Sequence, residues 1–245
     1  METYENTVVR RIGYVFFLLV ILVYMLGIGN GDAEMPVNEH RVGDIVTFGV
    51  YDQDNNAENG AEPIKWIVLA AKDGQYLLLS RNGLDAMPFH NGEEDTDWEH
   101  CSLRTWLNND FLQQAFIQDA RKAIRTTLVS NSKDQGSANS ASGGADTQDR
   151  IFLLSWKEAF KDYMSVNAAR MCQPTETAKA HGALYSAGTN GLDISAPWLL
   201  RSPADSLMNT MIVEHDGAEM FCNIHLGQNM VRPALWVSAN APGLE

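Results

Sequence analysis

Basic residues are scarce in this chain. It has 18 Lys and Arg residues against 31 Asp and Glu residues, which gives a formal net charge of −13 at pH 7. A surface of this sign repels phosphate groups, so the composition argues against nucleic acids and anionic lipid surfaces as partners. The simplest role of the acidic surface is to keep the protein soluble, and a functional acidic patch is the alternative.

Cysteine is also rare, with only Cys101, Cys172 and Cys222 in 245 residues. None of the three forms a C-x-x-C pair, which excludes a zinc knuckle and a thioredoxin-type redox centre. One disulfide with a spare thiol is compatible with this number, and so are three reduced, buried thiols. The sequence leaves the pairing open.

Three further sequence features are missing. No Gly-rich phosphate loop, no regular alternation of strands and helices and no internal repeat is found, which excludes a doubly wound nucleotide-binding fold. The polar loop Asp52–Gly60 has the Asp-x-Asp-x-Asn spacing of a calcium loop, but Ala57 and Pro63 stand where an EF-hand requires Gly and Glu. We therefore expect a solvated hairpin loop there.

The chain does contain one long apolar run. Ile12–Gly29 has 18 uncharged residues and follows Arg10-Arg11. The arginines predict a cytoplasmic N-terminal tip and translocation of the remaining chain, as a single-pass membrane anchor or, if cleaved, as a signal peptide of a secreted protein. We expect residues 1–33 to form this segment and residues 34–245 to form one extracytoplasmic domain.

The rest of the chain predicts strands, then helices, then strands. This order is typical of an α+β domain, with small antiparallel sheets and two or more packed helices. Strands are expected at 44–51, 64–69, 76–80, 124–129, 151–154, 197–201, 211–214, 220–224 and 231–237, and helices at 102–116, 118–125, 155–163, 167–171 and 174–179. Residues 131–148 lack an apolar period and are expected to form a flexible loop within the domain.

Arg104, Arg201 and Arg232 are the most informative polar residues. Arg201 and Arg232 stand in apolar, strand-like segments, and a buried guanidinium requires fixed partners. We expect all three to be structural, and a cluster that clamps an anionic ligand is the alternative. Four tryptophans with apolar neighbours are expected in the core: Trp66, Trp106, Trp198 and Trp236.

Several segments, in order along the chain, carry a resemblance to a known family. They are Gly43–Gly49, Pro63–Leu69, Leu77–Ser80, Trp98–Asn108, Asp149–Ser155, Trp198–Pro203 and Val231–Trp236. Over residues 41–238 the chain resembles a bacterial extracellular family, the domain of unknown function six-two-seven-three. That family has no assigned activity, so the resemblance implies architecture and a cell-surface context, and it transfers no catalytic or binding residue.

The family is in turn similar to the C-type lectin-like and sulfatase-modifying fold group. This second resemblance implies two helices beside a small antiparallel sheet and a closing strand with a structural arginine. It also raises the question of a reactive cysteine. Cys222 and His225 lie three residues apart, and on a strand they would point to opposite faces, which argues against a catalytic pair.

An acidic loop is the expected binding surface. It contains Glu93, Glu94, Asp95 and Asp97, is flanked by histidines and leads into Trp98, which we expect to face solvent. The carboxylates offer oxygen ligands for calcium, and no other cofactor is expected. A plain solvated run of charges is the alternative.

The sequence therefore predicts a non-catalytic binding module whose partner is a cell-surface or extracellular glycan or protein. An extracellular enzyme of the formylglycine-generating or hydrolytic type is the first alternative, and a structural envelope component is the second. The ligand, the metal dependence and the oligomeric state do not follow from the sequence.

Overall fold

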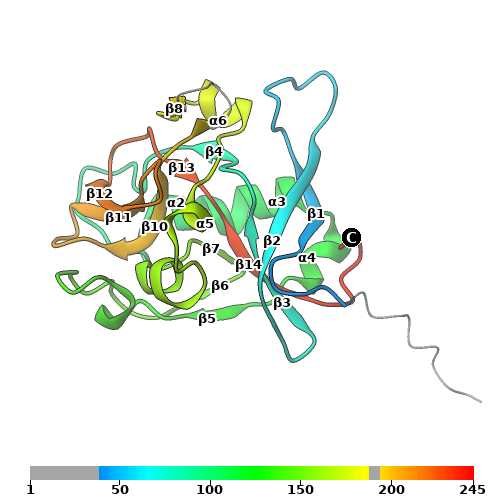
Figure 1. The fold of residues 1–245 in the computed structure, drawn as a ribbon, viewed down its shortest axis with the longest axis horizontal. Coiled ribbons are helices and arrows are strands. Elements are labelled where there is room, and N and C mark those ends of the chain that lie inside the picture. Colours follow the sequence, from blue (N-terminus) through cyan, green and yellow to red (C-terminus); the bar gives the residue numbers. More distant parts are fainter. Residues whose placement is uncertain (1–38, 188–193) are drawn as a thin grey trace, which may run out of the picture. The chain divides into compact units, whose positions relative to one another are not determined.

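Two five-stranded sheets form the framework (Figure 1). The computed structural model describes residues 39–187 and 194–245, and the apolar run Ile12–Gly29 and the boundary at residue 33 lie outside them. The described residues belong to one compact unit, Asn38–Glu245. Among them, no helix has the length and apolar character needed to cross a membrane.

The first sheet is antiparallel throughout, in the order β1-β2-β3-β14-β7. Its strands are β1 (Ile45–Tyr51), β2 (Glu62–Lys72), β3 (Gln75–Ser80), β7 (Ile151–Phe152) and β14 (Ala234–Ser238). Asp73 and Gly74 join β2 to β3 with φ angles of 52° and 69°. Two consecutive positive φ angles match the twist of a tight hairpin, which explains why an Asp-Gly pair stands there.

The second sheet has the order β12-β11-β10-β13-β4. Its strands are β4 (Asp85–Ala86), β10 (Trp198–Pro203), β11 (Asn209–Val213), β12 (Glu219–Asn223) and β13 (Met230–Val231). β10 and β13 run parallel, and the other neighbours are antiparallel. Two small ribbons complete the strands: β5 (Thr127–Val129) with β6 (Thr147–Asp149), and β8 (Ser186–Ala187) with β9 (Ile194–Ser195).

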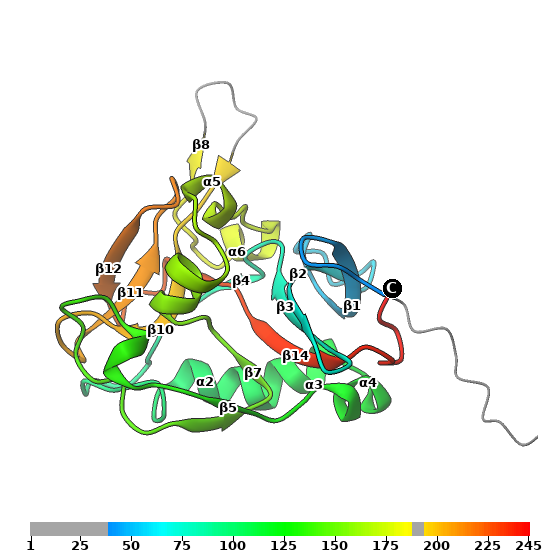
Figure 2. The ribbon, with the colours of Figure 1, turned by 60° about the horizontal axis from the view of Figure 1, so that its bottom comes forward.

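The helices are short. They are α2 (Ser102–Trp106), the π-helical η1 (Leu107–Phe111), α3 (Leu112–Ala115), α4 (Gln118–Ala123), the 3-10 turn η2 (Lys133–Gln135), the π-helical η3 (Glu158–Asp162), α5 (Asn167–Arg170) and α6 (Glu176–Ala180). Figure 2 shows α2, α3 and α4 along one side of the molecule, beneath β7 and β14. Antiparallel sheets with few helices confirm the α+β class predicted from the sequence.

Aromatic rings fix the first helices against the first sheet. Phe116 packs on Phe48 of β1 and on Trp66 of β2, with ring centroids 5.0 and 6.3 Å apart. Gly49 makes this contact feasible, because a Cβ there would lie 2.5 Å from the Phe116 ring. The register of β1 and β2 also shifts between Thr47 and Val50.

The prediction of a single strand over residues 231–237 is wrong. The segment is divided into β13, in the second sheet, and β14, in the first sheet, by Arg232 and Pro233. Pro233 has no N–H group to donate to a ladder, which favours a break in pairing at this point. The chain also crosses between the sheets at residues 81–84, after β3. We call these neighbouring crossings, residues 81–84 and 232–233, the seam.

Residues 131–148, the expected flexible loop, contain η2 and the start of β6. Gln135 accepts hydrogen bonds from Ser155 and Ser202, and Ala141 donates one to Ala204. Asn131 is buried, and its side chain bonds the carbonyl of Ala145 at 2.8 Å. The segment is therefore tied to the second sheet at several points.

Candidate functional site: an aromatic groove and the neighbouring acidic loop

The acidic loop joins β4 to α2. Glu93, Glu94 and Asp95 are exposed, and Glu94 lies 3.4 Å from the buried Nε2 of His90. The backbone N–H of Glu94 and the His90 ring lower the pKa of Glu94. His90 Nδ1 accepts from the backbone N–H of Ser102 at 3.3 Å, which leaves the proton on Nε2, facing Glu94. The role of Glu93, Glu94 and Asp95 as ligand-binding residues stays a prediction.

The expectation that Trp98 faces solvent is wrong. Its side chain is 0% exposed and packs against Phe89, with ring centroids 6.0 Å apart. The indole N–H donates to Asp149 Oδ2 at 2.9 Å. Burial of an indole requires such a partner for its single N–H group, so the ring is held in the core and offers no stacking face.

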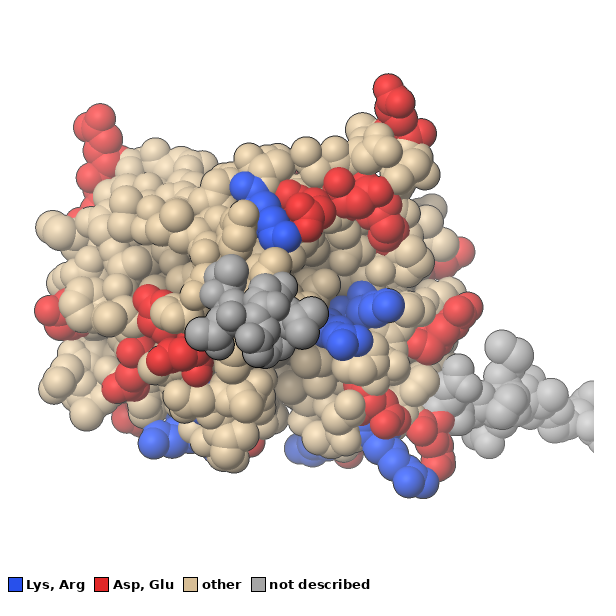
Figure 3. Space-filling view, turned by 45° about the horizontal axis from the view of Figure 1, so that its top comes forward, with Lys and Arg blue, Asp and Glu red and all other residues tan. Residues whose placement is uncertain are grey.

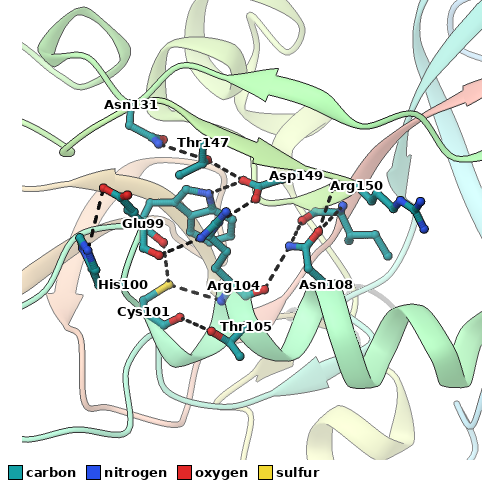
Figure 4. Close-up of polar contacts among 12 residues, drawn as sticks. Glu99, His100, Cys101, Arg104, Thr105, Asn108, Asn131, Thr147, Asp149 and Arg150 are labelled. Carbon is teal, nitrogen blue, oxygen red and sulfur yellow. Dashed lines mark hydrogen bonds and ion pairs between the residues drawn. The ribbon is translucent and has the colours of Figure 1, made fainter.

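Asp149 is the centre of a buried polar network that fixes the end of the acidic loop (Figure 4). Its Oδ1 accepts from Arg104 Nε at 2.7 Å, and its Oδ2 also accepts from the Thr147 hydroxyl at 2.7 Å. Arg104 Nη1 donates to the carbonyl of Glu99 at 2.8 Å. Arg104 on α2 therefore ties the loop to β6 through a charge-assisted hydrogen bond.

Among the described residues, two groups of ionisable side chains have the spacing of metal ligands. In the first, Asp97, Glu99 and His100 place their ligand atoms within 4.8 Å of one another, and His100 Nδ1 lies 2.8 Å from Asp97 Oδ1. Glu93, Glu94 and Asp95 are not part of this group. Calcium prefers six to eight oxygen ligands, and this group supplies carboxylates from only two residues.

The second group lies in the β1–β2 loop and consists of Asp52, Asp54 and Glu62. Its oxygens already accept hydrogen bonds within the loop, Asp54 from Asn56 and Glu62 from the backbone of Gln53. The carboxylates thus hold the turn that the sequence predicts.

A groove that the sequence did not predict lies beside the acidic loop. Its volume is about 540 Å³, within the range of roughly 300–1,000 Å³ found for small-ligand sites. The groove is lined by Leu184, Tyr185, Ser186, Pro197, Ile212, Glu214, His215, Phe221, Cys222, Asn223, Leu226, Gln228 and Asn229. Figures 1 and 2 show β12, which supplies Phe221, Cys222 and Asn223, at the edge of the second sheet.

Two aromatic side chains that line this groove are exposed to solvent. Tyr185 is 51% exposed and Phe221 is 52% exposed, and Leu184 and Leu226 beside them are also exposed. An exposed ring presents an apolar face, and tyrosine adds a polar end. Exposed apolar side chains that gather in one place mark interaction sites more often than single ones do.

The groove also contains polar groups with free hydrogen-bonding capacity. Within the described residues, the side-chain N–H groups of Asn223 and the side chain of Gln228 make no hydrogen bond, whereas Asn223 Oδ1 accepts from His225 N at 3.0 Å. Glu214 holds His215 Nδ1 at 3.0 Å through one oxygen. Rings with amides and one carboxylate can stack a sugar ring and bond its hydroxyls.

The groove adjoins the acidic loop through His90. The backbone N–H of His90 donates to the carbonyl of Ile224 at 3.0 Å, and His225 Nδ1 lies 3.2 Å from the carbonyl of His90. The chain that leaves the groove after Asn223 is thus hydrogen-bonded to the start of the loop.

The three arginines have different partners. Arg104 donates a hydrogen bond to the carboxylate of Asp149. Arg201 is 2% exposed, donates to both oxygens of Glu158 and bonds the carbonyl of Leu153 at 2.8 Å. Arg232 is 1% exposed and bonds only backbone carbonyls, those of Ser80 and Arg170. Arg104 and Arg201 thus satisfy their charge internally.

The expected core tryptophans differ in depth. Trp66 and Trp198 are fully buried, and their indoles donate to the carbonyls of Phe48 and Arg170 at 2.7 and 2.9 Å. Trp106 and Trp236 are partly buried and pack against the core.

All three cysteines are free. Burial raises the pKa of Cys101 and of Cys222 to about 12, and it raises the pKa of Cys172 as well. Cys222 Sγ lies 3.2 Å from Asn229 Nδ2, whereas His225 turns to His90. A thiol with a raised pKa is protonated at neutral pH, so none of the three is an activated nucleophile.

One signal in the sequence pointed to the groove. Met220 and Phe221 are adjacent apolar residues, and both are about half exposed on β12. Successive residues of a strand face opposite sides, so one of two such neighbours must turn away from the core. The contribution of Tyr185, which comes from a distant part of the chain, had no comparable signal.

The fold and the site define the chain as an α+β protein with two sheets joined at a seam and an aromatic groove on the second sheet. The family model of the domain of unknown function DUF6273 matches residues 73–239, and the chain belongs to that family. No curated protein and no solved structure matches the chain.

Proposed function

We propose that this protein is a glycan-binding module and that the groove around Tyr185 and Phe221 is its binding site. The observation that carries the proposal is the pair of half-exposed rings in a groove of about 540 Å³ lined with amides. Aromatic faces suit the apolar face of a pyranose ring, and side-chain amides both donate to and accept from hydroxyl groups.

The location in this proposal rests on the sequence. Residues 12–29 anchor the protein or direct its export, and the domain from residue 34 onward acts outside the cytoplasm as a membrane-bound or secreted module. The acidic surface is compatible with that location. A relationship to the C-type lectin-like group belongs to the same proposal, and it is supported by the α+β class and the closing strand β14 after Arg232.

The alternatives receive less support from the side chains. The protonated thiols remove the nucleophile that the formylglycine-generating alternative requires. A structural envelope component would offer a flat apolar patch, whereas the exposed residues Leu184, Tyr185, Phe221 and Leu226 line a concave groove.

The test is a glycan array with residues 34–245, which include the compact unit Asn38–Glu245, run with calcium and with chelator. We expect binding that Tyr185→Ala and Phe221→Ala each weaken at least tenfold. Leu128→Ala is the matched control, because Leu128 is 62% exposed on β5 and does not line the groove. An absence of binding under both conditions, or equal binding by all variants, contradicts the proposal.

Calcium is treated separately in the same experiment. If Asp97, Glu99 and His100 hold a calcium ion that contributes to binding, the chelator lowers the signal and Asp97→Asn has the same effect. Binding that is unchanged by chelator leaves the groove as the site and removes calcium from the proposal.

A further inference from the structure

A second cleft lies at the seam between the sheets. Its volume is about 460 Å³, and its lining includes Arg81, Asn82 and Arg232 from the two crossings. The crossings are hydrogen-bonded to each other, Ser80 N to the carbonyl of Pro233 at 2.9 Å and Leu84 N to that of Val231 at 3.0 Å. The cleft walls are therefore fixed by both sheets.

Arg232 is held in place without an acidic partner. Its Nε donates to the carbonyl of Ser80 at 2.9 Å, its Nη1 to that of Arg170 at 3.3 Å, and its guanidinium lies 4.8 Å above the Trp198 ring. Nη2 makes no hydrogen bond within the described residues. A buried guanidinium normally has a carboxylate partner, as Arg201 has in Glu158.

Arg81 supplies a second unpaired cation. It is exposed, and its guanidinium forms no ion pair or hydrogen bond with any residue that the structure describes. No Asp or Glu is found among the described residues that line the cleft. On the face drawn in Figure 3, acidic side chains are more numerous than Lys and Arg side chains.

This combination is unusual for a chain with a net charge of −13. Structural arginines need only internal partners, and Arg104 and Arg201 have them. Two guanidiniums that share a cleft, with no carboxylate among its described lining residues, form an arrangement by which proteins recognise carboxylates and sulfates. Ile67 and Met171 add an apolar wall that can contact the body of a small ligand.

We infer that the cleft at the seam binds the oxyanion group of a small ligand, a carboxylate or a sulfate, between Arg81 and Arg232. The site is separate from the aromatic groove, and no lining residue is shared. Burial lowers the pKa of Arg232, and no described carboxylate opposes this. A bound anion therefore supplies the negative charge that none of the described lining residues supplies.

Trp198 provides a local reporter. Its indole N–H donates to the carbonyl of Arg170 at 2.9 Å, the same carbonyl that accepts from Arg232 Nη1. The experiment titrates the full chain, kept in a nonionic detergent, with sodium sulfate or sodium glucuronate against sodium chloride of equal ionic strength. The dissociation constant is measured by calorimetry, and the site is located by the indole N–H resonance of Trp198.

We expect saturable binding and a shift of the Trp198 resonance that chloride does not produce. Arg81→Gln, an exposed change that leaves the packing of Arg232 intact, is expected to weaken binding at least tenfold. Arg150→Gln removes the same charge from another exposed position and is expected to leave the affinity unchanged.

Saturation by one salt alone identifies whether the ligand carries a sulfate or a carboxylate, and saturation by both indicates a general oxyanion site. The inference is overturned if neither salt shifts the Trp198 resonance beyond chloride, or if Arg81→Gln and Arg150→Gln bind equally. Glycan binding at the aromatic groove is measured separately, so either proposal can fail alone.

Discussion

Arg201 on β10 donates to both carboxylate oxygens of Glu158, the first residue of η3. The Glu158 carboxylate also accepts from the backbone N–H of Ser155 at 2.8 Å. One ion pair therefore connects the second sheet to the start of the helical segment after β7. The side chains are only 2% and 21% exposed, so water screens the pair weakly.

Removal of one partner should be costly. Arg201→Met leaves the Glu158 carboxylate without its cation, and we expect the free energy of unfolding to fall by about 3–5 kcal/mol. Lys122→Met is the control, because its pair with Asp119 is exposed and should be worth less than about 1 kcal/mol. Urea denaturation measures both. Equal losses for the two variants would contradict the structural role of Arg201.

Gly49 tests the packing of the first sheet on the helices. Gly49→Ala puts a Cβ within 2.5 Å of Phe116 at a φ of +73°. Gly60→Ala shares the positive φ, +88°, but meets nothing within 4 Å, so it isolates the backbone strain. We expect about 1–2 kcal/mol of destabilisation at Gly60 and a further ~1–3 kcal/mol at Gly49 from overlap. Denaturation midpoints that do not separate the two variants would show that Phe116 moves freely.

Alkaline pH should weaken the fold through the thiols. The pKa of Cys222 is raised to about 12 in the folded protein, whereas the unfolded thiol titrates near its ordinary value. As the pH rises, the thiol of the unfolded chain loses its proton before the thiol of the folded protein does. The buried thiol therefore stabilises the folded state fully below the ordinary thiol pKa, and this stabilisation decreases as the pH rises from there toward 12. The slope is about 1.4 kcal/mol per pH unit and thiol.

Cys222→Ala should reduce the slope of unfolding free energy against pH between about pH 9 and 10. Urea denaturation at several pH values measures it. Tyr51, whose pKa burial also raises, contributes equally to wild type and variant and serves as the internal control. An unchanged slope in the variant would exclude Cys222 as the source.

His100 reports the geometry of the acidic loop. The hydrogen bond to Asp97 raises the pKa of His100, and Glu99 contributes less. We expect its imidazole resonances to titrate above the ordinary histidine value, and Asp97→Asn to return the pKa toward it. Glu99→Gln should produce a smaller decrease. A proton NMR titration measures each pKa, and an unaltered value in Asp97→Asn would contradict the contact at 2.8 Å.

The first three strands of the first sheet in chain order, β1, β2 and β3, were predictable because local signals agreed. Alternating apolar residues and the Asp73-Gly74 turn predict β2 and β3 without knowledge of the rest of the fold. The division of β13 from β14 was not predictable from apolar pattern alone. Residues 231–237 are apolar apart from Arg232, and Pro233 permits a break, but the partner strands decide that the two parts enter different sheets.

The candidate sites also differ in how far the sequence alone could predict them. The acidic loop was visible as a run of charges, but Trp98 lies in the core because its partner, Asp149, comes from 51 positions further along the chain. The groove joins residues 184–186 to residues 212–229, and the cleft at the seam joins residues 81–82 to Arg232. Such juxtapositions depend on tertiary contacts that no local window of sequence contains.

The seam has a consequence for how the molecule comes apart. All strands of the second sheet lie between the two crossings in sequence, whereas the first sheet takes β1, β2 and β3 from before them and β14 from after them. Arg232 bonds the last residue of β3 from between β13 and β14. β4 and β13 of the second sheet continue through the seam into β3 and β14 of the first, and the two crossings are hydrogen-bonded to each other, so opening the seam disturbs both sheets. The two sheets are therefore not separable folding units, and the protein gains cooperativity from a few residues that belong to neither sheet.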